Sequence, residues 1–78
     1  MTEYDEQFNG ELAIANKLIR AASRKAREAG LKYPRYIYIP KHNEYSSLIG
    51  MLGIDYNLVP VFYNKDEIII TEEKLKDV

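Results

Sequence analysis

The 78-residue sequence contains no cysteine and no tryptophan. The absence of cysteine excludes disulfide bonds, zinc–thiolate centres and thiol nucleophiles. Small secreted domains usually depend on disulfide bonds, because a short chain buries only a limited core. We therefore expect a cytoplasmic protein.

Long apolar runs are also missing. The longest cover only a few residues, such as Ile68–Ile70, whereas a membrane-spanning helix needs about 20 apolar residues. The amino terminus is acidic and polar, the opposite of a secretory signal peptide. These two features predict a protein without a membrane partner.

Residue types that support catalysis are scarce. His42 is the single histidine, which excludes a histidine-rich metal site. None of the three serines (Ser23, Ser46, Ser47) lies in a nucleophile-elbow motif. We expect no catalytic residues, no metal and no cofactor, and therefore a protein that is not an enzyme.

The net charge is small, but the charged residues are strongly segregated along the chain. The net charge is −1, yet residues 17–41 hold eight bases and one acid. Residues 1–16 hold four acids and no base, and residues 42–78 hold seven acids and three bases. The middle of the chain is thus +7 and each flank is −4, which predicts a local electrostatic field despite the small total.

A first helix is predicted from about residue 10 to 29. Its apolar positions form one stripe at helical spacing: Phe8, Leu12, Ala15, Leu18, Ile19, Ala22, Ala26 and Ala29. Asn9 is the expected N-cap, with a start near Thr2 as the alternative. Gly30 follows the stripe and is expected to end the helix in the left-handed conformation.

Shorter elements follow. Residues 35–39 within YPRYIYIP alternate in the period-two pattern of a strand. A second helix is predicted at about 43–52, with Asn43 as N-cap, Gly53 just past its end and a buried stripe of Tyr45, Leu48, Ile49 and Leu52. Residues 57–63 and 67–71 are expected to form a hairpin, in which Pro60 requires a sheet edge or a bulge.

The element order α-β-α-β-β predicts a small two-layer α+β domain, in which two helices pack on one face of a three-stranded sheet. The first strand, the second helix and the second strand would form a parallel crossover unit. We expect one domain over residues 1–78 and allow the acidic segment 1–9 and the tail 72–78 to be loose. The pattern leaves the strand order open, and it predicts one uncovered sheet face.

Tyrosines are predicted on that uncovered face. If Ile37 and Ile39 face the helices, then Tyr36 and Tyr38 face outward, with Arg35 at the start of the strand. Tyrosine and arginine are enriched at protein interfaces, so these three residues are the candidate partner-binding site. An ordinary half-buried sheet surface and base stacking are the alternatives.

Four bases on the first helix share one side. Lys17, Arg20, Arg24 and Arg27 are spaced three, four and three residues apart and form a ridge opposite the apolar stripe. Such a ridge is able to follow a nucleic-acid phosphate backbone. A solvated surface and docking on an acidic protein are the alternatives, and the near-neutral total is atypical of nucleic-acid-binding domains.

A third candidate site lies in the loop after the first strand. Lys41, His42 and Asn43 precede a predicted helix N-terminus, where anions bind in open α/β sheets. No glycine-rich loop accompanies them, so this anion or ligand site has the weakest support.

These observations favour a non-enzymatic interaction module that docks on a protein partner or on itself as a homodimer. A phage or mobile-element accessory or inhibitor protein would fit the size and composition. A nucleic-acid-binding module on the basic ridge is the alternative hypothesis, and a small anion-binding protein is the second alternative.

Overall fold

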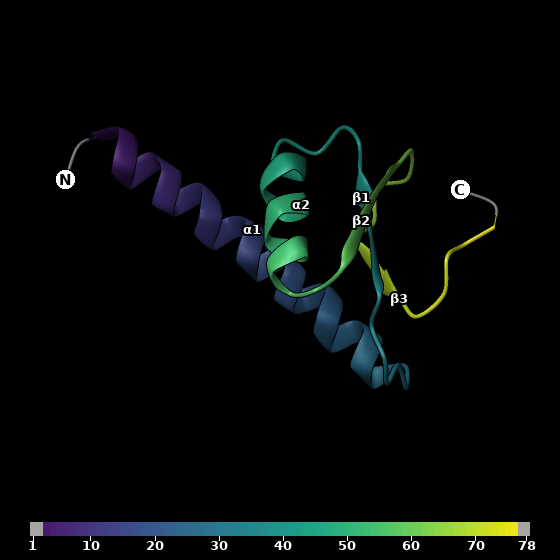
Figure 1. Cartoon of the computed structure of the whole chain (residues 1–78). Coiled ribbons are helices and arrows are strands. Elements are labelled where there is room, and N and C mark those ends of the chain that lie inside the picture. The colour runs from purple at the N-terminus through teal and green to yellow at the C-terminus, as the bar shows by residue number, and fades with distance from the viewer. Residues whose placement is uncertain (1–2, 77–78) are drawn as a thin grey trace.

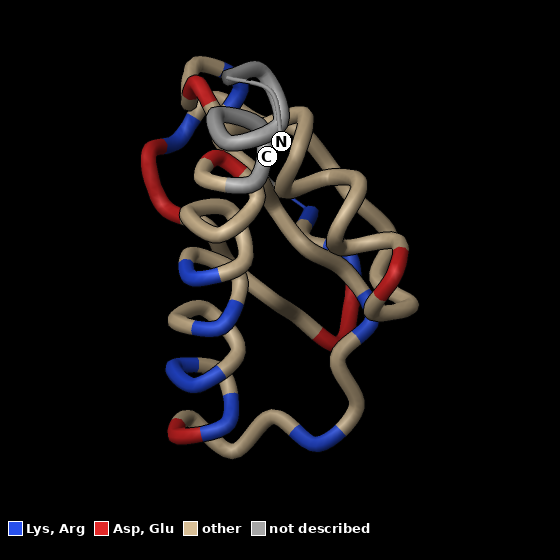
Figure 2. Tube along the Cα trace, turned by 90° about the vertical axis from the view of Figure 1, so that its left-hand side faces the viewer, with Lys and Arg blue, Asp and Glu red and all other residues tan. Residues whose placement is uncertain are grey.

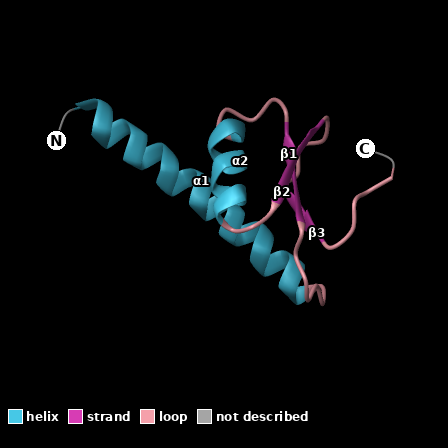
Figure 3. Cartoon of the chain, in the orientation of Figure 1, coloured by secondary structure: helices cyan, strands magenta, loops and turns pink. Residues whose placement is uncertain are grey.

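Two helices and a three-stranded sheet form the chain, in the order α1 (Glu3–Glu28), β1 (Tyr36–Pro40), α2 (Ser46–Asp55), β2 (Val59–Tyr63) and β3 (Ile69–Thr71). This computed structural model describes residues 3–76, with side chains from residue 10 onward. Both helices lie on the same side of the sheet (Figures 1 and 3). The predicted two-layer α+β fold and element order are confirmed.

Helix α1 is longer than the pattern predicts. It begins at Glu3 and runs through Asn9, so the predicted N-cap at Asn9 is wrong. Its end is as expected, since Gly30 has a positive φ of 95°, which glycine adopts without steric cost. Ala15, Ile19 and Ala22 are buried, while the first half of the helix extends past the sheet (Figure 1). Phe8 lies outside the described side chains.

Strand β1 is the centre of the sheet, and the strand order is β2-β1-β3. It pairs in parallel with β2 and antiparallel with β3. The predicted crossover unit is therefore present, but the predicted hairpin of β2 and β3 is wrong because β1 lies between them. The reason is burial: Ile37 and Ile39 are fully buried, and a nearly continuous apolar strand takes the position with neighbours on both sides.

Helix α2 begins and ends three residues later than expected. The side chain of Asn43 accepts a hydrogen bond from the Tyr45 N–H at 2.8 Å, so it shapes the preceding turn and is not the N-cap. Gly53 lies inside the helix and is buried, so the prediction that it follows the helix end is also wrong. Asn57, with a φ of 62°, adopts the left-handed conformation beyond the helix.

The glycines of α2 explain how closely this helix approaches the sheet. A Cβ added at Gly53 would lie 3.0 Å from Cγ2 of Ile37, and one added at Gly50 would lie 3.1 Å from Cζ of Phe62. The Ser46 hydroxyl also donates to the Pro40 carbonyl. The side of α2 that carries Ser46, Gly50 and Gly53 thus faces β1 and β2. The predicted stripe of Tyr45, Leu48, Ile49 and Leu52 still joins the core.

The sheet face opposite the helices is not left open. The chain after β3 returns along this face (Figure 1), and the Leu75 N–H donates to the Tyr38 hydroxyl at 2.7 Å. The rings of Tyr38 and Tyr63 also pack with centroids 5.4 Å apart. Tyr38 is consequently 0% exposed, which contradicts its predicted place on an open face. The Leu75 backbone and the Tyr63 ring thus both contact Tyr38 on this face.

Across residues 3–76, neither helix is long and apolar enough to cross a membrane.

Candidate binding surfaces

The four bases of the predicted ridge all lie on the exposed surface of α1. Lys17, Arg20, Arg24 and Arg27 are solvent-exposed, and blue Lys and Arg positions recur turn after turn along this helix (Figure 2). Ala15, Ile19 and Ala22 face the opposite side and are buried. The structure therefore brings the ridge together as the spacing predicts, because the helix fixes i, i+3 and i+4 neighbours locally.

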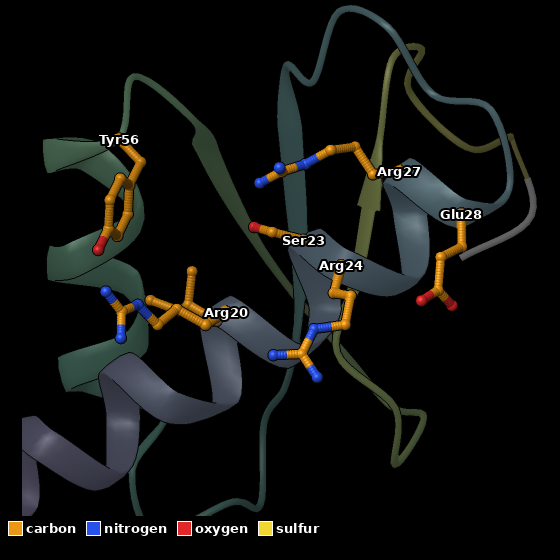
Figure 4. A pocket seen from close by; sticks show the side chains of 7 residues that line it. Arg20, Ser23, Arg24, Arg27, Glu28 and Tyr56 are labelled. Carbon is orange, nitrogen blue, oxygen red and sulfur yellow. The ribbon is translucent and has the colours of Figure 1, made fainter.

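The ridge borders a groove that sequence reasoning did not find. An open groove of about 770 Å³ runs between α1 and the end of α2. Its lining residues are Ile19, Arg20, Ser23, Arg24, Arg27, Glu28 and Tyr56. Figure 4 shows Arg20, on α1, facing Tyr56, which follows the end of α2. The Ser23 hydroxyl lies between Tyr56 and Arg27 in this view. The groove thus combines three cations, a hydroxyl donor and an aromatic ring.

Tyr56 is held in place on the wall of the groove. Its hydroxyl donates to Oδ1 of Asn16 at 2.7 Å. Its N–H bonds to the carbonyls of Leu52 and Gly53 at 3.1 Å each. The side chain is nevertheless 50% exposed. A ring that is fixed by hydrogen bonds yet half open to solvent offers a preformed surface for stacking. The sequence analysis did not single out Tyr56, which lies just after the end of α2.

Among the side chains of residues 10–76, no carboxylate forms an ion pair with the guanidinium groups of the groove. Among the side chains of residues 10–76, the recorded ion pair joins Lys25 to Glu67. Lys25 lies on the side of α1 that faces β3. Arg20, Arg24 and Arg27 are absent from any such pair in that part of the chain. Neighbouring like charges on a helix repel one another, so this arrangement favours an anion in the groove.

The predicted partner site on the tyrosine strand is only partly on the surface. Arg35 is exposed and Tyr36 is half-buried, whereas Tyr38 is fully buried beneath the C-terminal segment. These three residues therefore do not form one exposed patch. The period-two pattern correctly places Tyr36 and Tyr38 opposite the helices, but it carries no information about what returns to cover that face.

The loop after β1 brings Lys41, His42 and Asn43 together without an adjacent helix N-terminus. Lys41 and His42 are exposed, and the Asn43 side chain is engaged by the Tyr45 N–H. Helix α2 begins only at Ser46, whose N–H bonds to the Asn43 carbonyl at 3.1 Å. The first amide of α2 is therefore already bonded, and the helix begins three residues beyond Asn43. Among the side chains of residues 10–76, no cluster of three or more potential metal ligands occurs.

Exposed apolar side chains gather beside β2, on a surface that the sequence analysis did not single out. Met51 is 56% exposed, Ile54 is 60% exposed and Phe62 is 45% exposed. The Phe62 ring lies against Gly50 of α2, and Ile54 follows Gly50 by one helical turn on the same side. Met51 is three residues from Ile54, so these three side chains are neighbours. We call them, with the outer backbone of β2, the apolar edge.

The backbone of the apolar edge is unpaired on its outer side. The Val59 N–H donates to the Arg35 carbonyl at 2.8 Å, and the Tyr63 carbonyl accepts from the Lys41 N–H at 2.9 Å. Because residues of a parallel strand bond alternately to the two sides, Pro60 and Phe62 direct their polar groups outward. The prediction that Pro60 requires an edge or a bulge is confirmed, since β2 is an edge strand.

Comparisons with protein-family models, with curated proteins and with solved structures found no match to this chain.

Proposed function

We propose that this chain is a non-enzymatic interaction module that docks on protein through the apolar edge, with a second copy of the chain as its partner. The observation that carries the proposal is the coincidence of exposed apolar side chains with an unpaired edge strand. Solvated edges of this kind are normally blunted by charge or covered. Large exposed apolar patches mark interaction sites.

The edge is self-complementary. The Phe62 N–H and carbonyl both point outward, so two antiparallel β2 strands related by a twofold axis at Phe62 would exchange two hydrogen bonds there. Pro60 has a carbonyl but no N–H to offer, and in this register its carbonyl accepts from the Asn64 N–H of the other copy. A six-stranded sheet would result, in which every outward amide from Phe62 to Asn64 is paired.

The position of α2 is compatible with this register of the two β2 strands. A twofold axis perpendicular to the sheet places α2 of both copies on one side, with Met51 and Ile54 of each facing the axis. Strand pairing supplies the hydrogen bonds, and the side chains supply the apolar burial that stabilises the association. The tyrosine strand, which the sequence favours for this role, contributes the buried centre of each half.

The test is gel filtration with light scattering over a concentration series. The wild type is expected to show a dimer mass at high concentration. Phe62→Glu places two carboxylates next to the axis, and like charges at an interface cost several kcal/mol. Self-association should therefore weaken by more than about tenfold.

Tyr33→Glu is the matched control. Tyr33 is an exposed aromatic residue in the loop between α1 and β1, so this variant introduces the same charge away from the apolar edge and should still dimerise. A wild type that stays monomeric at every concentration, or a Phe62→Glu variant that dimerises as well as the wild type, would contradict the proposal.

A further inference from the structure

We infer that the groove between α1 and Tyr56 binds single-stranded nucleic acid, with the arginines on phosphates and Tyr56 stacked on a base. This inference is independent of the proposed docking, because the groove and the apolar edge share no residue. It rests on the charge, the spacing and the composition of the groove.

Charge complementarity identifies an anionic occupant. Arg20, Arg24 and Arg27 project from one side of α1 and have no carboxylate partner within residues 10–76. Glu28 is the one acid of the lining, and Figure 4 shows it pointing away from Arg27. Exposed guanidinium groups that lie side by side match the oxygens of phosphate groups, with several donors each.

The spacing indicates an extended, repeating anion. At a rise of 1.5 Å per residue, Arg20 and Arg27 lie about 10 Å apart along α1, and Lys17 extends the ridge to about 15 Å. One strand whose bases stay stacked as in a duplex, with about 3.4 Å between successive charges along its axis, presents about four phosphates over that length. A single free phosphate would occupy only one part of such a ridge.

The aromatic wall selects an unpaired base. Tyr56 is anchored through Asn16 and half-exposed beside Arg20 (Figure 4). Proteins that bind single strands combine a positive groove with aromatic rings on which bases stack. In a duplex the base faces are stacked on one another, so they are not available to stack on Tyr56. Ser23 adds a neutral hydroxyl between the arginines, suited to a phosphate or sugar oxygen.

The first experiment measures binding of a fluorescent oligothymidylate of about 15 nucleotides by anisotropy, as salt rises from about 50 to 200 mM. Binding should weaken steeply with salt. The triple variant R20Q/R24Q/R27Q removes three phosphate contacts, so the slope of log affinity against log salt should fall by about 2. The matched control, Lys25→Gln, removes a cation from the same helix on the side facing Glu67 and should leave the slope unchanged.

The second experiment isolates the ring. Tyr56→Ala should weaken single-strand binding by about 5- to 150-fold, the range found for loss of one stacked base. Tyr56→Phe keeps the ring and should bind within a few-fold of the wild type. Circular dichroism checks that each variant retains its helices.

Three results would overturn the inference. The first is no binding at the lowest salt. The second is equal affinity for a duplex probe with no effect of Tyr56→Ala, which would indicate phosphate contact without stacking. The third is binding to polyglutamate as tight as to the oligonucleotide, which would make the groove a site for an acidic protein.

Discussion

Strands β1 and β2 are parallel neighbours of five residues each, and both are rich in β-branched and aromatic side chains. Their environments nevertheless differ. Ile37, Tyr38 and Ile39 of β1 are 0% exposed, whereas Phe62 of β2 is 45% exposed. The difference comes from position in the sheet, because β1 has a strand on each side and β2 has one. Strands of similar composition therefore take different positions: β1 is the buried centre of the sheet, and β2 is an edge strand.

The largest expected effect follows from truncating β1. Ile37→Ala should lower the free energy of unfolding by about 2–5 kcal/mol, because it leaves a cavity where Gly53 of α2 meets the sheet. A domain of this size has a total stability of about 4–12 kcal/mol, so much of it would be lost. Urea denaturation followed by circular dichroism measures the change. A loss below about 1 kcal/mol would contradict the contrast between β1 and β2, since β1 would then not be the structural centre.

A smaller effect is expected where the C-terminal segment covers β1. Tyr38→Phe keeps the ring and removes the hydroxyl that accepts the Leu75 N–H. The loss should be about 0.5–1.5 kcal/mol, the usual net value of one hydrogen bond. In hydrogen exchange, the Leu75 amide should also lose protection in this variant. If both stability and exchange match the wild type, then the segment does not hold Tyr38.

High pH should destabilise the same face. Burial, followed by the nearby Glu67 carboxylate, raises the pKa of Tyr63 above its ordinary value. Because the folded state holds this proton more tightly, the contribution is complete below about pH 10 and is lost as pH rises through the raised value. Tyr63→Phe should therefore lose less stability than the wild type as pH rises above about 10. Identical pH profiles would mean that Tyr63 does not contribute.

The smallest expected change in stability comes from β2. Phe62→Glu, which should weaken self-association, is expected to lower the unfolding free energy of the dilute monomer by no more than about 1 kcal/mol, because the ring contacts Gly50 but remains 45% exposed. Urea denaturation at a concentration well below that of dimer formation measures it. A loss comparable to that of Ile37→Ala would show that Phe62 belongs to the core and would remove the contrast between the two strands.

Local patterns predicted more of this molecule than long-range ones. The ridge of Arg20, Arg24 and Arg27 and the helix end at Gly30 follow from residue spacing within one helix. The position of β1 does not, because a short loop between two strands looks the same whether or not a third strand separates them. The burial of Tyr38 was missed for a similar reason, because it depends on Leu75, which lies far along the chain.

The candidate sites follow the same rule. The sequence identified the cations of α1 but not the groove, since Tyr56 reaches the groove from the turn after α2. Gly50 and Gly53 lie on the side of α2 that faces the sheet, whereas Met51 and Ile54 are exposed on the same helix.

Amide hydrogen exchange at Phe62 tests the central claim most directly. Its N–H points away from β1 in the monomer and pairs with the second copy in the proposed dimer, whereas the Val61 N–H points toward β1 in both states. As protein concentration rises, the Phe62 amide should become protected in step with dimer mass, while Val61 protection changes far less. A Phe62 amide that exchanges freely at every concentration would contradict docking through the apolar edge.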